Sequence, residues 1–195
     1  MNLGDWFEED TSTESIARDC SYPGAGYAQV CGHEVESHVE SWPWMKTLLD
    51  VRARKELVER LTKLRPDAQP IWGRMSAHQM VCHLSDSLRA ALGEKHISRS
   101  TSLFKRVILK RLALWAPIPW PHGFKTRPEM DQEQGGGTPP VEFASDLEEF
   151  RTLLGRFCML EGEFAPHAMF GQMSKTERLR YAYLHIDHHL RQFKV

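Results

Sequence analysis

The sequence predicts an all-α fold, because apolar residues recur at helical spacing in several segments and no stretch alternates as a half-buried strand does. Residues that typically start and end helices bound those segments. The length of 195 residues, with 41% hydrophobic and 26% charged residues, is typical of one globular domain. The residues therefore favour a four-helix bundle with an extra short helix and a long loop rich in proline and glycine.

Residues 1–44 differ from the rest of the chain, because they are rich in Glu, Ser, Asp and Gly and have no apolar period. Such a segment buries too little apolar surface to offset the entropy lost on ordering. We therefore predict a disordered extension at 1–44 and a helical domain at 45–195. The metal-binding side chains of the extension are Cys20, Cys31, His33 and His38. Their spacing matches no paired-cysteine zinc pattern, which favours a solvated tail over a zinc site.

Two helices are predicted in the first part of the domain. Asp50 is a suitable N-cap for a helix whose apolar positions continue to Leu64, and Pro66 then ends it. Ser76 is a suitable N-cap for a second helix, and Gly93 is placed to end that helix.

A third, basic amphipathic helix is predicted from Leu103 to Trp115, after Ser102 and before Pro117 and Pro119. Its basic side chains are Lys105, Arg106, Lys110 and Arg111. These charges could dock on a membrane surface, but they more often form the solvated face of an amphipathic helix, and we favour that role.

Two capping-box signatures predict the last two helices. Ser145 is followed three residues later by Glu148, which indicates a helix running to about Gly162. Ser174 and Glu177 repeat the same spacing, and the helix that they start continues almost to the end of the chain.

A long loop over 116–144 separates the third and fourth helices and holds six prolines and the glycine triplet 135–137. Loops of this length within a compact domain are usually functional or disordered. The aromatic side chains of Trp115, Trp120 and Phe124 favour packing of this region against the helices. The glycines do not form a phosphate-binding loop, because no Gly-Lys-Ser/Thr follows them and no strand precedes them.

The last predicted helix carries a histidine pair with metal-binding spacing. His185 and His189 lie within roughly 40° of one another around a helix, at the edge of its apolar stripe. Imidazoles four residues apart can chelate one metal ion, and a third ligand must then come from another segment. His188 flanks the pair, and we interpret it as a supporting or surface residue rather than a fourth ligand.

The second predicted helix offers the third ligand. His83 lies beside the apolar stripe, and Asp86 follows three residues later on a neighbouring face. His78 is rotated by roughly 140° from His83, so the two cannot enter one site, and His78 is expected at the helix start or the surface. Cys82 is interpreted as a small buried hydrophobic residue rather than a ligand.

The motifs on these two helices resemble the DinB/YfiT-like superfamily. They are Ser-Ala-His-Gln-Met-x-x-His-Leu-x-Asp at 76–86 and His-x-x-x-His-x-x-Gln at 185–192. The loop motifs over 119–133 and the Phe-Gly-Gln-Met-Ser run at 170–174 are similar to a poorly characterised bacterial branch of that superfamily. The resemblance covers about residues 45–195.

The resemblance implies an up-down-down-up four-helix bundle that holds a divalent metal ion on His83, His185 and His189. Better-known branches are thiol transferases that use mycothiol or bacillithiol, and others isomerise small thiol conjugates. This chain ends in His189-Leu190-Arg191-Gln192 where the superfamily commonly has His-Arg-Gly-Gln, so a substrate contact from that ending does not carry over.

Composition and net charge argue against several classes of protein. The net charge of −1, with ten His counted as neutral, argues against a general nucleic-acid surface. No run of about 18 apolar residues exists, so no membrane-spanning helix is expected. The first ten residues lack the basic and apolar regions of a secretory signal, and four cysteines are too few for a disulfide framework. We therefore expect a cytoplasmic protein that acts on a small molecule and can pair as a homodimer.

The expected function is that of a metal-dependent enzyme, a thiol S-transferase or a hydrolase. A three-histidine site leaves coordination positions open, at which Zn, Ni or Fe could activate water or a low-molecular-weight thiol. Asp86, Tyr181 and Gln192 could orient a ligand or bound water, and Arg127 could bind an anionic group of the substrate. The alternative is a non-catalytic bundle that binds a metal or a partner.

Overall fold

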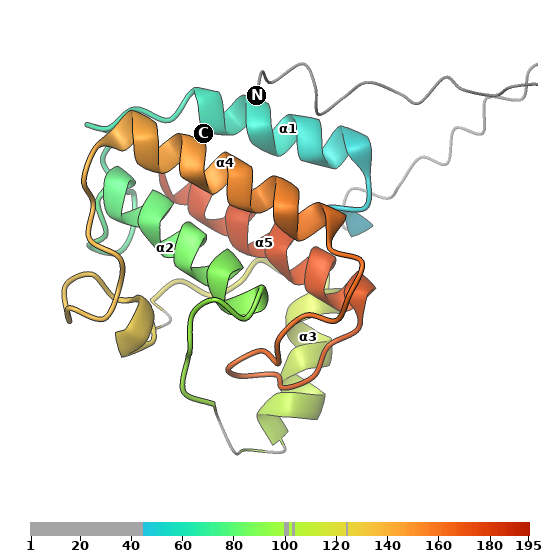
Figure 1. The fold of residues 1–195 in the computed structure, drawn as a ribbon. Helices are drawn as coiled ribbons and strands as arrows, with labels where there is room; N and C mark the ends of the chain where they lie inside the picture. The colour runs from blue at the N-terminus through green and yellow to red at the C-terminus, as the bar shows by residue number, and fades with distance from the viewer. Residues whose placement is uncertain (1–44, 100–101, 103, 124) are drawn as a thin grey trace, which may run out of the picture. The chain divides into compact units, whose positions relative to one another are not determined.

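The computed structural model describes residues 45–99, 102, 104–123 and 125–195, and this part of the chain is all-α (Figure 1). It contains five α-helices, one π-helical turn and one 3-10 turn, and no strand among the described residues. The elements are α1 (Val51–Thr62), α2 (Ala77–Ala91), η3 (Lys105–Leu109), α3 (Lys110–Trp115), η4 (Pro128–Met130), α4 (Phe143–Met159) and α5 (Lys175–Gln192). The predicted disorder and the zinc alternative for 1–44, and the packing of Phe124, lie outside the described residues.

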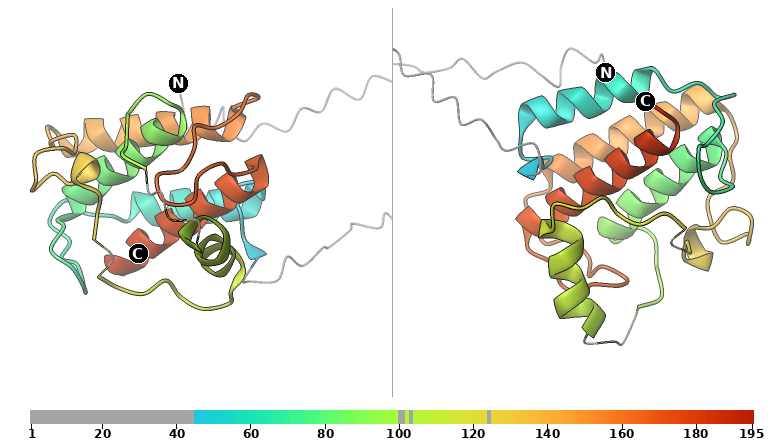
Figure 2. Two further views of the ribbon diagram at one scale, coloured as in Figure 1. Left: turned by 90° about the horizontal axis from the view of Figure 1, so that it is seen from below. Right: turned by 180° about the vertical axis from the view of Figure 1, so that it is seen from behind.

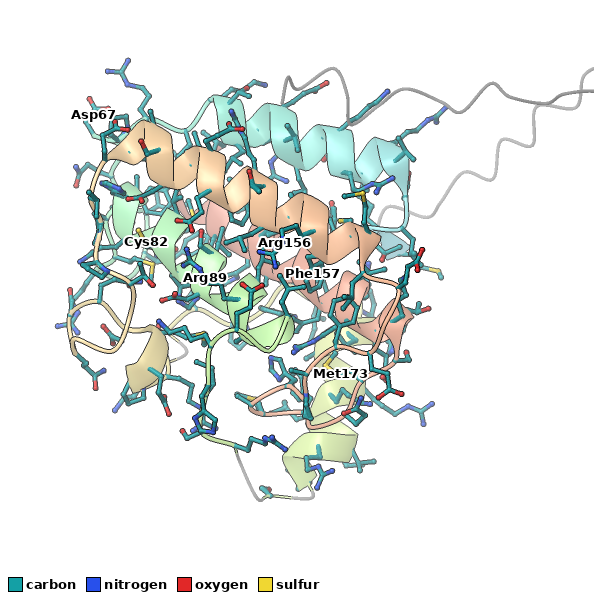
Figure 3. The ribbon with its side chains drawn as sticks, viewed as in Figure 1. Asp67, Cys82, Arg89, Arg156, Phe157 and Met173 are labelled. Atoms are coloured by element: carbon teal, nitrogen blue, oxygen red, sulfur yellow. The ribbon has the colours of Figure 1, made fainter. Side chains whose placement is uncertain are left out.

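One hydrophobic core is shared by α1, α2, α4 and α5. In Figures 1 and 2, α4 runs beside α2, and α5 lies against both α1 and α2. The largest side chains that are fully buried in this core are Leu57, Leu61, Met80, Leu84, Phe150, Phe157, Leu179 and Leu190. Figure 3 shows Phe157 on α4 among the surrounding side chains, where its ring packs 4.6 Å from that of Phe164. Helical spacing of these apolar residues therefore turns one face of each helix inward.

Three of the predicted helix starts are confirmed. The side chain of Asp50 accepts hydrogen bonds from two backbone N–H groups at the start of α1. Ser76 and Ser174 both form complete capping boxes, with Gln79 and Glu177 returning the second bond.

The predicted start of the fourth helix is wrong. The carboxylate of Glu142 accepts from the backbone N–H groups of Ala144 and Ser145, so α4 begins at Phe143 and Ser145 lies inside its first turn. The helix also ends at Met159, short of Gly162. The free N–H groups at the start of a helix favour an acidic side chain just before it. Because Glu142 caps α4 in this way, Ser145 has no capping role.

The third predicted helix is divided. Its first part is the π-helical turn η3, and only Lys110–Trp115 is α-helical. A smaller apolar cluster of Leu114, Phe170 and Met173 joins α3 to the turn before α5. The Nε atom of Arg180 on α5 donates to the carbonyl of Leu114 at 3.0 Å, which fixes α3 to α5.

The long loop before α4 has a defined conformation. Trp120 packs as expected, since its indole Nε1 donates to the carbonyl of Ala113 at 2.8 Å. Trp115 is partly exposed, and the guanidinium of Arg180 on α5 lies 5.7 Å from the centre of its ring. The backbone carbonyl of Asp131 accepts from Gly136 and Gly137, which closes the loop on itself after η4. A Cβ atom at Gly136 would lie 2.1 Å from the carbonyl oxygen of Pro128, so this turn requires glycine.

None of the helices in the described part of the chain is long and apolar enough to cross a membrane.

Candidate metal centre

Three histidines from two helices converge between α2 and α5. One ligand atom from each of His83, His185 and His189 lies within 4.8 Å of the other two. The Nε2 atoms of His83 and His185 are 3.2 Å apart, and these two residues are only 4% and 9% exposed. The structure therefore brings together the three residues on which the sequence predicted a metal.

Local sequence explains this convergence. His83 precedes Leu84, which is fully buried in the core, so the inward face of α2 carries the imidazole toward α5. His185 and His189 are one turn apart on α5, next to the core residues Ile186 and Leu190. Because α2 and α5 pack together, the three rings meet at the edge of the shared core.

Gln192 fixes the ring of His189. The Nδ1–H group of His189 donates to Oε1 of Gln192 at 2.9 Å, while Nε2 of the same amide donates to the carbonyl of Trp72 at 2.7 Å. The second bond identifies which end of the amide is the oxygen, so the proton of His189 is on Nδ1 and Nε2 carries the lone pair. Gly73 is needed beside this amide, because a Cβ there would lie 2.9 Å from it.

The other two rings are held in a similar way. Nδ1 of His83 donates to the carbonyl of Met130 at 3.3 Å, so η4 of the long loop orients this ring. Nδ1 of His185 lies 3.3 Å from the hydroxyl of Ser87. A hydroxyl can donate or accept, so His185 can adopt the tautomer that a ligand at its Nε2 requires. Each ring therefore has a separate partner on the nitrogen that faces away from the centre.

Burial keeps the three imidazoles uncharged. Desolvation lowers the pKa of His83, and it lowers the pKa of His185 well below its ordinary value, with the neighbouring histidines adding to the effect. Desolvation and His83 lower the pKa of His189 to about 3. Neutral imidazole is the form that coordinates a metal ion, so at neutral pH all three rings are in the ligand form.

Aromatic rings surround one side of the three histidines. We call this set the aromatic wall, and its members are Trp72, Trp120, His122, Tyr181 and His188. The ring of Trp120 lies 6.2 Å from that of His185, and the ring of Tyr181 lies 5.5 Å from it. The indole of Trp72 stacks on His122 at 3.9 Å. The wall therefore combines the long loop with α5 and places Tyr181, a predicted site residue, beside a candidate ligand.

His188 belongs to this wall rather than to the three-histidine group. Its ring is half-buried and lies 5.5 Å from Trp72 and 6.1 Å from Trp120. Burial lowers its pKa to about 4. The sequence interpretation of His188 as a supporting residue agrees with this position.

His167 was not singled out from the sequence. Its Nδ1 accepts from the backbone N–H groups of Met169 and Phe170, so its proton is on Nε2. Its ring lies 4.4 Å from that of Tyr181, and desolvation lowers its pKa to about 3. The turn that holds His167 closes on Gly171, whose φ of 70° is a conformation that glycine favours.

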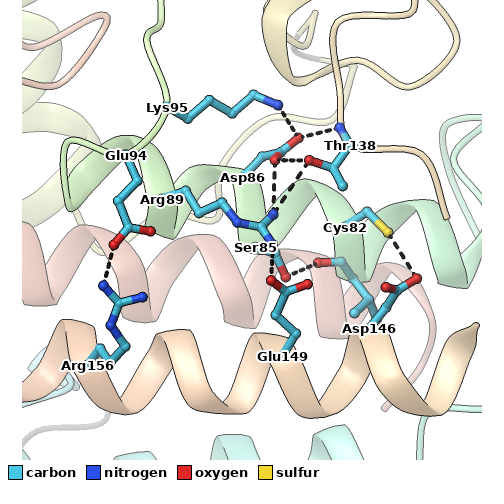
Figure 4. A network of polar contacts seen from close by, with 11 residues as sticks. Cys82, Ser85, Asp86, Arg89, Glu94, Lys95, Thr138, Asp146, Glu149 and Arg156 are labelled. Carbon is cyan, nitrogen blue, oxygen red and sulfur yellow. Dashed lines mark hydrogen bonds and ion pairs between the residues drawn. The ribbon is translucent and has the colours of Figure 1, made fainter. Parts of the chain in front are cut away.

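Asp86 contacts the loop instead of the histidines. Its buried carboxylate accepts from the backbone N–H and the hydroxyl of Thr138 at 2.8 and 2.6 Å, and pairs with Lys95 and Arg89 (Figure 4). Asp86 acts on His83 only through its negative charge, which raises the pKa that burial lowers. Among the described contacts its role is therefore to anchor the loop on α2.

Arg127 also lies away from the three histidines. Its Nη1 atom is 3.5 Å from the hydroxyl of Ser98, and the guanidinium is half-buried. Its charge contributes to the lowered pKa of His167, after desolvation and Arg178.

A second group of possible ligands lies elsewhere on α2 and is formed by His78, Cys82 and Asp146. Here the donors already bond one another, because His78 Nε2 donates to Asp146 Oδ2 at 2.6 Å and the Cys82 thiol lies 3.7 Å from the same oxygen. Burial raises the pKa of Cys82 to about 12, which opposes formation of a thiolate ligand. His78 lies in the first turn of α2, as one of the two predicted positions, and it is half-buried as a partner of Asp146 on α4.

The chain belongs to the family described as protein of unknown function DUF1569, which it matches over residues 44–195. No curated protein and no solved structure matches it.

The lowered pKa values of the buried histidines predict the pH dependence of stability in the metal-free protein. Unfolded histidine binds a proton below about pH 6.5, whereas His189 remains neutral in the folded chain until about pH 3. Its contribution to stability is therefore complete above pH 6.5 and is lost as the pH falls, by about 1.4 kcal/mol per pH unit. Urea unfolding at pH 7.5, 6.5 and 5.5 measures this slope.

The matched variants are His189→Gln, which we expect to have a shallower slope, and His96→Gln on the exposed loop after α2, which we expect to keep it. Equal slopes for the His189→Gln variant and the parent would contradict the assignment.

Proposed function

We propose that this protein is a metal-dependent enzyme of the DinB-like type, which binds a divalent ion on His83, His185 and His189. The observation that carries the proposal is the arrangement of the ring nitrogens. Each Nδ1 has its own partner, in Met130, Ser87 and Gln192, while the opposite nitrogens of the first two rings meet at 3.2 Å. In metal sites, the ring nitrogen of a ligand histidine that does not bind the ion typically forms such a hydrogen bond.

The donor set fits Zn, Ni or Fe, because these ions accept neutral imidazole. When bound, the ion would act as a Lewis acid that lowers the pKa of water or of a low-molecular-weight thiol. Three protein ligands leave positions open for such a nucleophile, as catalytic sites require. We therefore propose thiol transfer or hydrolysis on a small molecule.

The surrounding residues would bind and orient the substrate. Trp120 and Tyr181 exclude water from one side of the histidines, and the ring of Trp72 extends this apolar surface. Burial raises the pKa of Tyr181 to about 12, so its hydroxyl stays protonated and can donate a hydrogen bond. His167 holds its proton at Nε2, and Arg127 supplies a positive charge for an anionic group near the same wall.

Two features support the DinB-like, up-down-down-up four-helix bundle as the framework of this enzyme. Four helices, α1, α2, α4 and α5, share one core, and α3 is an additional short helix. The candidate ligands come from the second and the last helix of the domain, in the order that the resemblance implies.

The metal-binding half of the proposal predicts that the intact chain binds one equivalent of Zn²⁺, Ni²⁺ or Fe²⁺ in calorimetric titration. We expect His185→Ala to lower the affinity at least a hundredfold, since only two ligands remain. The control is His96→Ala on the exposed loop after α2, which we expect to change the affinity by less than about threefold.

The catalytic half is tested with the metal-loaded protein and a panel of thiols, electrophiles and hydrolysable esters. Turnover that disappears in His185→Ala supports the enzyme. Stoichiometric metal without turnover would favour the non-catalytic metal-binding bundle, and absence of stoichiometric metal in the parent would refute the site itself.

Gln192 provides a second prediction, because it orients His189 without reaching the metal position. We expect Gln192→Ala to weaken metal binding by about 10–100-fold, the usual effect of removing a residue that supports a ligand. Gln192→Glu retains an acceptor for Nδ1–H and should recover part of that loss. Equal affinity in the parent and in Gln192→Ala, measured by competition with a chromophoric chelator, would count against the assigned role.

A further inference from the structure

The segment of η3 and α3 turns an apolar face to solvent. Its exposed hydrophobic residues are Phe104, Val107, Ile108, Leu112, Trp115 and Ile118. Phe104, Ile108, Leu112 and Trp115 are spaced four, four and three residues apart, so they form one row along the helix. Single exposed hydrophobic residues are common, but a continuous row on one face indicates a binding surface.

The opposite face already has its partners within the domain. Leu114 is fully buried against Phe170 and Met173, and Lys110 pairs with Glu177 on α5 at 2.8 Å. In Figures 1 and 2, α3 lies at the edge of the described domain, and no other helix covers its far side. The guanidinium of Arg106 also lies on this inner side, against Gly171. We name the exposed row, together with Arg111, the α3 face.

Charge identifies the kind of partner. Residues 45–195 contain 24 Lys and Arg against 17 Asp and Glu. Residues 96–128, which include the α3 face, contain seven of the basic residues and none of the acidic ones, so the rest of the domain is balanced at 17 of each. The whole positive excess of the domain is therefore in the segment that carries the exposed apolar row.

A second copy of this chain fits the α3 face poorly. Packing two such faces together would bring Arg111 toward its counterpart in a segment that has no acidic residue. In the described part of the chain, the guanidinium of Arg111 is not paired with a carboxylate. An anionic surface would neutralise this charge and cover the apolar row at the same time.

We propose that the α3 face binds the surface of an anionic lipid bilayer. The apolar row, with Phe104 near one end and Trp115 near the other, enters the boundary between headgroups and acyl chains, as in helices that lie in the plane of the membrane. Arg111, which lies beside the row, binds a lipid phosphate. From the sequence we favoured a helix whose basic side chains are simply solvated. The proposal differs from that interpretation because the structure also exposes the apolar row of the helix.

The test is co-sedimentation of the intact protein with vesicles. We expect binding to phosphatidylcholine vesicles that contain 30% phosphatidylglycerol, and about tenfold weaker binding to phosphatidylcholine alone or in 0.5 M salt. F104S/L112S should weaken binding to the anionic vesicles about tenfold, and R111E should also weaken it about tenfold.

The controls match these changes at other sites. V141S/M159S removes two exposed hydrophobic residues outside the α3 face, and R52E makes the same charge change on α1. Both should bind the anionic vesicles as the parent does, and all four variants should keep the parent's melting temperature within a few degrees.

Three results would overturn the proposal. The first is equal binding of the parent to neutral and anionic vesicles, or no binding to either. The second is an equal loss in the control variants. The third is that the parent is a dimer in analytical ultracentrifugation and that F104S/L112S is a monomer with unchanged vesicle binding. This result would show that the α3 face binds a second copy of the chain.

Discussion

Three uncharged imidazoles packed between α2 and α5 are the contact on which the candidate site depends. Burial in the shared core removes water from His83, His185 and His189, and it lowers their pKa values so that none carries a charge at neutral pH. Because the Ser87 hydroxyl can donate to Nδ1 of His185, the Nε2–H group of His185 can donate to Nε2 of His83 at 3.2 Å, and the partners at Nδ1 hold the rings in this contact. The cost of burying three polar rings is met by hydrogen bonds that also prepare them as ligands.

The long loop also helps to position these histidines. Met130 in η4 orients His83, and Trp120 lies beside the rings of His185 and Tyr181 on α5. Asp86 attaches the end of the loop to α2 through its hydrogen bonds with Thr138. The sequence suggested that Asp86 orients a ligand, and in the structure it instead supports the site by holding this loop. The α3 face, which adjoins the start of this loop, would bring the aromatic wall near an anionic surface.

Much of the fold and part of the site could be predicted from the sequence. Helical spacing and local capping determined the starts of α1, α2 and α5, and the pair at His185 and His189 follows from one turn of helix. Ser87 could have been found, since it lies four residues after His83 on the same face. The Met130 carbonyl could not, because a backbone acceptor leaves no side-chain pattern. His167 could not either, because the turn before α5 positions its ring through backbone N–H groups.

X-ray absorption spectroscopy of the zinc-loaded protein tests the central claim most directly, because it identifies the atoms around the ion. We predict three nitrogen ligands at about 2.0–2.1 Å with the outer-shell scattering of imidazole, and no sulfur. A sulfur ligand at about 2.3 Å would contradict the account, because it would assign the ion to Cys82 with His78 and Asp146.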